Sequence, residues 1–142
     1  MPVDLGGHDV VARLHLQLKP GPQAASEGRH ALDRLEGAVD DEPLGELRLL
    51  VTELLTNSVR HGGCHDWITL DVEIYTNAVR GVITDRGAGF EPEPTPRPHL
   101  DRPGGWGLCL VDSLADRWGV DRGRETSVWF EMQRDGFARA AA

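Results

Sequence analysis

LRLLVTELLTNSVRHGG, the stretch from Leu47 to Gly63, predicts one long amphipathic helix. At about 100° per residue, its apolar positions fall on a single face, and the hydroxyl of Ser58 falls on that face with them. Asp41 and Pro43 indicate where the helix starts, and Gly62-Gly63 indicate where it stops. The rest of the chain is expected to pack around this helix.

Glu53 and Asn57 are four residues apart in this helix, so one side chain lies above the other beside the apolar face. The carboxylate can accept a proton, and the carboxamide oxygen can join the oxygen shell of a hard cation. An ordinary core helix also carries such a pair at its surface. The pair alone therefore does not decide between a site and a plain helix surface.

Length and composition indicate one globular domain, because the chain has 142 residues and 39% of them are hydrophobic. We expect a single domain over 1–142, with a core at about 10–133 and a frayed tail from Arg134 to Ala142. No apolar run approaches the roughly 20 residues of a membrane span, and MPVDLGGHDV is not a signal peptide. These features predict a cytoplasmic protein with no membrane partner.

The charge of the chain limits its partners further. Its formal net charge of -8 argues against direct binding to a nucleic-acid backbone. Lys19 is the only lysine, so any phosphate-binding site must use arginine, backbone amides or a metal ion.

Hydrophobic periodicity predicts the remaining elements. Alternation predicts five strands, at Ala12–Leu18, Ile68–Tyr75, Val79–Asp85, Arg117–Asp121 and Thr126–Met132. Helices are predicted at Ala24–Val39 and after the glycines that precede Leu108. The second and third strands are separated by a short turn and should pair antiparallel. The proline-rich segment Glu91–Pro103 is expected to be a surface loop.

Two glycine-rich segments carry the strongest functional signal. Asp85 ends a strand with its side chain on the inward face, and Gly87 and Gly89 allow backbone to approach a ligand closely. The second segment, Gly104–Gly107, opens a helix, where free amides and the helix dipole favour a phosphate. Each segment alone could be a turn or a hinge. No GxxxxGK[ST] loop is present, and no GxGxxG follows the first strand.

Taken in order, these motifs resemble the boxes of the GHKL ATP-binding family, the gyrase, Hsp90, histidine kinase and MutL relatives. ELLTN with His61-Gly62 resembles the N box, DRGAGF at Asp85–Phe90 the DxGxG box, and GWGL at Gly105–Leu108 the GxG box. Within the family, the chain is most similar to the small stand-alone anti-sigma factor serine/threonine kinases of bacteria. The resemblance covers Leu14 to Met132.

The resemblance implies an α/β (α+β) two-layer sandwich, in which helices cover one face of a mixed, mostly antiparallel sheet. It implies ATP and Mg²⁺ as ligands, with Asp85 accepting a hydrogen bond from the adenine amino group and Thr126 assisting. Asn57 would hold Mg²⁺, and Glu53 would take the proton from a serine or threonine hydroxyl, or from water. The loop Glu91–Pro103 would be a lid. The other implied nucleotide contacts are His61, Gly87, Gly89, Arg102, Gly104, Gly105, Trp106, Gly107 and Leu108.

The implied function is an ATP-dependent protein kinase that sequesters a sigma factor and phosphorylates its anti-anti-sigma antagonist on serine or threonine. Two alternatives stay open: a non-catalytic binding module in which ATP only orders the lid, and a detached histidine-kinase ATPase domain. The presence of both Glu53 and Asn57 favours the enzyme. The identity of the partners and a homodimeric state are left open, as is the effect of Glu125, which stands where relatives often carry glycine.

Overall fold

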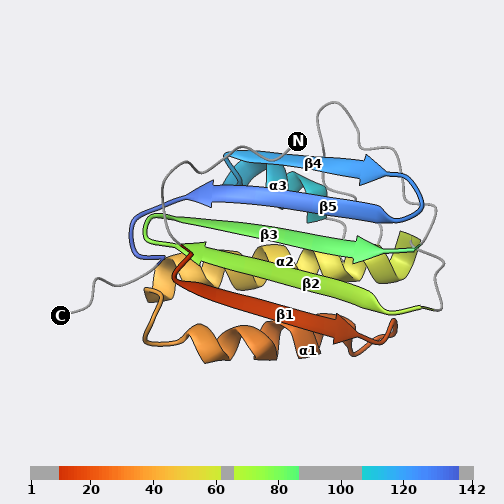
Figure 1. Ribbon diagram of the computed structural model, residues 1–142, viewed down its shortest axis with the longest axis horizontal. Helices are drawn as coiled ribbons and strands as arrows, with labels where there is room; N and C mark the ends of the chain where they lie inside the picture. Colours follow the sequence, from red (N-terminus) through yellow and green to blue (C-terminus); the bar gives the residue numbers. More distant parts are fainter. Residues whose placement is uncertain (1–9, 62–65, 87–106, 138–142) are drawn as a thin grey trace.

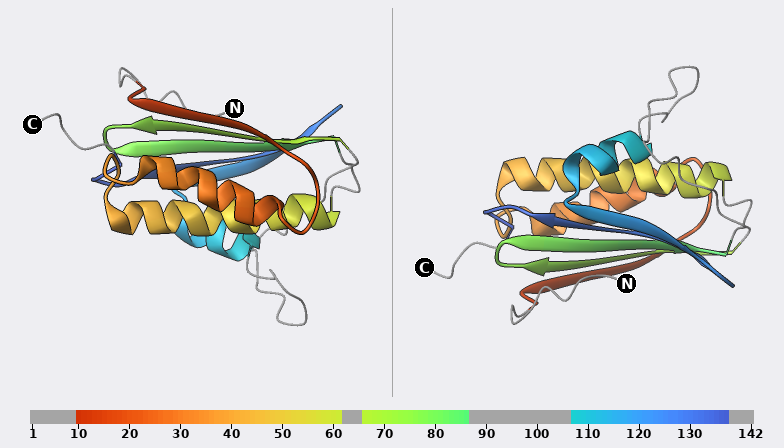
Figure 2. Two further views of the ribbon diagram at one scale, coloured as in Figure 1. Left: turned by 90° about the horizontal axis from the view of Figure 1, so that it is seen from below. Right: turned by 90° about the horizontal axis from the view of Figure 1, so that it is seen from above.

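The computed structural model describes residues 10–61, 66–86 and 107–137. Its centre is a five-stranded sheet with the order β1-β2-β3-β5-β4, in which all neighbouring strands pair antiparallel. The helices cover one face of this sheet (Figures 1 and 2). The two-layer α+β sandwich is therefore confirmed. Its described strands are wholly antiparallel, where the resemblance implies a mixed sheet.

The five strands lie where the alternation predicts them. They are β1 (Ala12–Leu18), β2 (Ile68–Tyr75), β3 (Ala78–Asp85), β4 (Arg117–Arg122) and β5 (Thr126–Gln133). Their ends differ from the prediction by at most one residue. β3 and β5 are neighbours at the centre of the sheet, and in their register Asp85 lies opposite Thr126.

Helix α2 (Asp41–His61) is the central element of the helical layer. Helix α1 (Ala24–Ala31) and helix α3 (Gly107–Leu114) pack on either side of it (Figure 2). The apolar face of α2 is fully buried against the sheet, as expected from its 3.6-residue period. The members of this face are Leu44, Leu47, Leu50, Val51, Leu54 and Leu55. Among the described residues, no helix has the length and apolar character needed to cross a membrane.

The helix predicted over Ala24–Val39 is wrong in its second half. The α-helix ends at Ala31, and a 3₁₀ turn, η1 (Leu32–Leu35), follows it. Gly37 then adopts a φ of +85°, which is a backbone conformation that side-chain-bearing residues rarely accept. The chain can therefore turn here toward the start of α2.

The core also extends past residue 133. The side chain of Phe137 is fully buried, and the backbone N–H of Asp40 donates to the carbonyl of Gly136 at 2.7 Å. The Arg134 guanidinium donates to the carbonyl of Leu114 at 2.6 Å and lies 3.4 Å from the carboxylate of Glu46. The prediction of a frayed tail is therefore wrong for residues 134–137, which join the start of α2 to the end of α3.

Candidate functional site

The end of the sandwich where β3 stops and β5 begins gathers buried polar side chains. Asp85 and Thr126 face each other in register, and their exposed fractions are only 5% and 2%. From α2 above them, the Ser58 hydroxyl donates to Oδ2 of Asp85 at 2.9 Å. Residues from three elements distant in sequence thus meet at one carboxylate, which the Ser58 hydroxyl holds from α2.

Ser58 is the residue of this cluster that sequence reasoning missed. It lies on the apolar face of α2 and is itself buried, so the helical pattern alone indicates only a member of the core. A buried carboxylate is costly unless hydrogen bonds satisfy it. A hydroxyl on an otherwise aliphatic face, above a sheet with an inward Asp85, is the signal that could have identified it.

Glu53 and Asn57 lie on the side of α2 that faces α3. Glu46, Glu53 and Asn57 follow one another at spacings of seven and four residues, which places them on one stripe of the helix. Arg134 links Glu46 to the last carbonyl of α3, at Leu114, so this stripe borders α3. Asn57 is 8% exposed. The predicted pair therefore lies beside the cluster of Asp85, at the boundary of two helices.

The direction of α3 brings its first residue toward the same end of the sheet. The backbone N–H of Asp116, just after the helix, donates to the carbonyl of Glu131 at 2.9 Å. Glu131 lies in the second half of β5, whereas Thr126 begins that strand. Gly107, the first residue of α3, therefore points back toward Thr126 and Asp85. A helix start with free amides is suited to bind an anion such as a phosphate.

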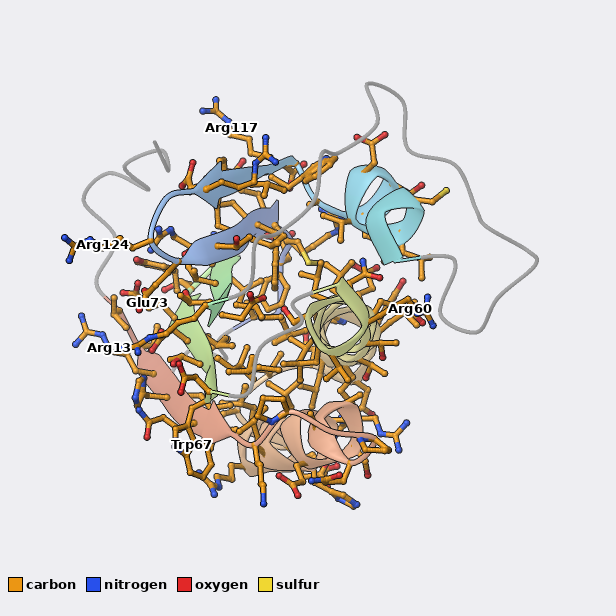
Figure 3. All side chains as sticks on the ribbon, turned by 90° about the vertical axis from the view of Figure 1, so that its right-hand side faces the viewer. Arg13, Arg60, Trp67, Glu73, Arg117 and Arg124 are labelled. Atoms are coloured by element: carbon orange, nitrogen blue, oxygen red, sulfur yellow. The ribbon has the colours of Figure 1, made fainter. Side chains whose placement is uncertain are left out.

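Glu53 has the electrostatics of a proton acceptor. Its Oε2 atom is buried and has no hydrogen-bond partner among the described residues. Burial raises the pKa of the Glu53 carboxyl, and the positive charge of Arg60 lowers that pKa in part. Figure 3 shows Arg60 on the side of α2 away from the sheet. A carboxylate with a raised pKa and an oxygen available for a proton fits a general base.

The donor atoms fit a magnesium ion that arrives with a nucleotide. Within the described part of the chain, no three His, Cys, Asp or Glu side chains gather to form a protein-only metal site. Mg²⁺ needs few protein oxygens when phosphates and water complete its shell. The nearly buried amide of Asn57 suits that role.

Glu125 forms an exposed ion pair with Arg86. Its carboxylate lies 3.7 Å from Nε of Arg86, whose guanidinium also lies 3.4 Å from Asp66. These residues line a polar pocket of about 230 Å³ next to Asp85, on the side of the open sheet face. Asp85 itself lines this pocket, and the remaining lining residues are Gln17, Trp67, Thr69 and Thr84. The charge of Glu125 is thus partly offset by Arg86.

The other predicted contacts are only partly covered by the described residues. His61 ends α2, and Gly107 and Leu108 begin α3, but the side chains of His61 and Leu108 are not described. The remaining predicted contacts and the predicted lid, Glu91–Pro103, lie outside the described residues. These contacts are Gly87, Gly89, Arg102, Gly104, Gly105 and Trp106.

Solved structures share this fold. The RsbU and RsbW domains of a Mycobacterium tuberculosis protein match 93% of this chain with a TM-score of 0.67 and 21% sequence identity. The match covers 35% of that longer chain, so this chain spans about a third of its length. The histidine kinase domain of a blue-light activated histidine kinase from Erythrobacter litoralis matches 79% of this chain and 60% of its own, with a TM-score of 0.52 and 22% identity.

Curated sequences are similar as well. A protein named serine-protein kinase RsbW from Listeria innocua is 29% identical over an alignment of 119 residues that covers 73% of this chain and 76% of the relative. Its namesake from Staphylococcus epidermidis is 32% identical over 111 residues, 68% of this chain and 67% of the relative. Residues 18–132 match the family described as histidine kinase-like ATPase domain. Because this match spans most of the chain and agrees with the fold, the chain belongs to the histidine kinase-like ATPase domain family.

Proposed function

We propose that this chain is an ATP-dependent serine/threonine protein kinase that binds a sigma factor and phosphorylates an anti-anti-sigma antagonist. Two relatives that carry the name serine-protein kinase support the reaction class. The observation that carries the proposal is Glu53, whose buried Oε2 lacks a hydrogen-bond partner among the described residues and whose pKa is raised by burial. A site without catalytic activity would not require such a carboxylate.

Each residue of the site has a distinct role in this reaction. Asp85 accepts a hydrogen bond from the adenine amino group, with Thr126 beside it, and the first amides of α3 face the phosphates. Asn57 would hold Mg²⁺, which would offset the charge of the phosphates. Glu53 takes the proton from the serine or threonine hydroxyl as the new P–O bond forms and the bond to ADP breaks.

Incubation of the purified chain with γ-labelled ATP, Mg²⁺ and a panel of purified bacterial anti-anti-sigma antagonists tests this proposal. We expect acid-stable label on serine or threonine of an antagonist, and none when EDTA removes the metal. ATP binding without transfer to any antagonist would favour the non-catalytic binding module. Acid-labile label on a histidine would favour a histidine-kinase ATPase domain.

The rate of transfer should depend on pH through Glu53. Protonation of Glu53 removes the base, so the rate should fall as the pH is lowered. Because burial raises the pKa of Glu53, this acid limb should lie above pH 4.5, the ordinary pKa of a glutamate. Arg60→Gln removes a positive charge that favours the ionised form, so the pKa of Glu53 should rise further. The measurement is the pH profile of single-turnover transfer, and we expect the acid limb of Arg60→Gln to move to higher pH.

Arg48→Gln is the matched control for this shift. Arg48 lies on the same helix, but its guanidinium pairs with Asp33 and Glu36, each at 2.7 Å. Its loss should leave the acid limb where it is in the wild type. An Arg60→Gln profile that stays in place, or moves to lower pH, would show that Glu53 is not the group that titrates.

A further inference from the structure

The hydrogen bond from Ser58 makes the two oxygens of Asp85 inequivalent. Its hydroxyl lies 2.9 Å from Oδ2, and both side chains are buried, so water does not compete freely for the contact. A hydrogen bond to a charged acceptor is about twice as strong as one between neutral groups. The bond therefore turns Oδ2 toward α2.

The two purine bases place different demands on a carboxylate. Adenine offers one amino group as a donor on the edge that a single acceptor oxygen can meet. Guanine offers a ring N–H and an amino group side by side, and this pair of donors is matched best by both oxygens of one carboxylate. A carboxylate that can rotate to present both oxygens therefore suits guanine well, and one that is held edge-on does not.

We infer that Ser58 is a specificity-determining residue that positions Asp85 to present a single oxygen to the base. The inference rests on the proposed function, because it requires Asp85 to lie at the base of a bound nucleotide. Ser58 itself acts through Asp85 as a positioning residue and does not touch the base. Selection of adenine thus depends on a side chain of α2 as well as on the end of β3.

Calorimetric titration of the full chain with the magnesium complexes of ATP, GTP and ITP tests this role. Ser58→Ala should lower the ratio of ATP to GTP affinity by about 10-fold, the order expected for a hydrogen bond to a charged group. Affinity for ATP should fall and affinity for GTP should rise. ITP lacks the 2-amino group of GTP and has only one of its two donors. Ser58→Ala should therefore raise the affinity for ITP less than the affinity for GTP.

Three further variants separate positioning from packing. Ser58→Thr keeps the hydroxyl and should give the wild-type ratio of ATP to GTP affinity. Ser58→Cys keeps the volume with a weaker donor, so its ratio should lie between those of the wild type and Ser58→Ala. Thr56→Val is the matched control, because the Thr56 hydroxyl donates to the carbonyl of Thr52 at 2.8 Å, within α2 itself. Its ratio should equal that of the wild type.

The outcomes separate this inference from the proposed function. If the wild type binds ATP but Ser58→Ala weakens ATP and GTP equally, or changes neither, Ser58 only supports the fold and the inference is wrong. If the wild type binds no ATP, both fail. A thermal melt of each variant shows that it is folded, and the ratio from Ser58→Cys replaces that of Ser58→Ala if the latter does not fold.

Discussion

Glu53→Gln should lower the rate of phosphoryl transfer to the antagonist by about 100-fold or more, the range expected when a general base is lost. Affinity for the ATP–magnesium complex should stay within a few-fold of the wild type, because the proposed role of Glu53 involves no contact with phosphate or metal.

Asn57→Ala should have a different effect from Glu53→Gln. It removes the proposed metal ligand, so it should weaken Mg²⁺-dependent nucleotide binding together with the rate of transfer. Single-turnover transfer and nucleotide affinity, measured for each variant, distinguish the two.

Glu46→Gln provides the matched control for Glu53→Gln. Glu46 lies on the same stripe of α2, but its carboxylate lies 3.4 Å from Nε of Arg134, at the far end of α3. Its neutralisation should leave transfer within a few-fold of the wild type. Transfer by Glu53→Gln at the wild-type rate would remove Glu53 from the role of base.

Loss of stability cannot account for the expected loss of rate. The pKa of Glu53 is raised in the folded protein, so the folded state binds the proton more tightly than the unfolded chain does. Stability associated with the protonated form is therefore present at low pH and lost as pH rises through the folded pKa. Glu53→Gln removes that loss and should be at least as stable as the wild type at pH 7, with a smaller difference at pH 4. Thermal melts at both pH values measure it.

Local sequence patterns were sufficient to predict most of the helices and strands. The strands appear in the sequence because apolar residues alternate at the period of a half-buried strand, and α2 appears because its apolar residues recur at the helical period. The helix predicted over Ala24–Val39 is wrong after Ala31, where the chain tightens into the 3₁₀ turn η1 and then turns at Gly37, whose φ is +85°. The end of the core differs from the prediction because Phe137 is buried in a core formed by distant parts of the chain, and its neighbour Gly136 contacts Asp40, nearly a hundred residues away.

The site divides in the same way. The boxes predict Asp85, Glu53 and Asn57 as site residues, and the structure brings Asp85 opposite Thr126 across two strands. The hydrogen bond to Ser58 depends on the height of α2 above the sheet, which no local pattern encodes. This hydrogen bond bears directly on the effect expected of a substitution at Asp85.

Asp85→Asn should lose most of the affinity for ATP, by about 100-fold or more, because a charge-assisted acceptor is lost and replaced by a donor. Ser58 determines which way the new amide turns. Its hydroxyl donates to position 85, so the amide oxygen should take the place of Oδ2, and the NH₂ group should face the base. Two amino groups would then meet at adenine.

Calorimetry of Asp85→Asn with ATP and GTP should therefore show the loss of ATP affinity. Adding Ser58→Ala lets the amide rotate, and the double variant should recover part of the ATP affinity, which independent effects would not produce. Asp121 is an exposed aspartate near the end of β4, and Asp121→Asn should change the affinity for neither nucleotide. Unchanged ATP binding by Asp85→Asn, or equal binding of ATP and GTP by the wild type, would remove Asp85 from the adenine site. Recovery of ATP binding in the double variant would show that Ser58 orients the group at position 85.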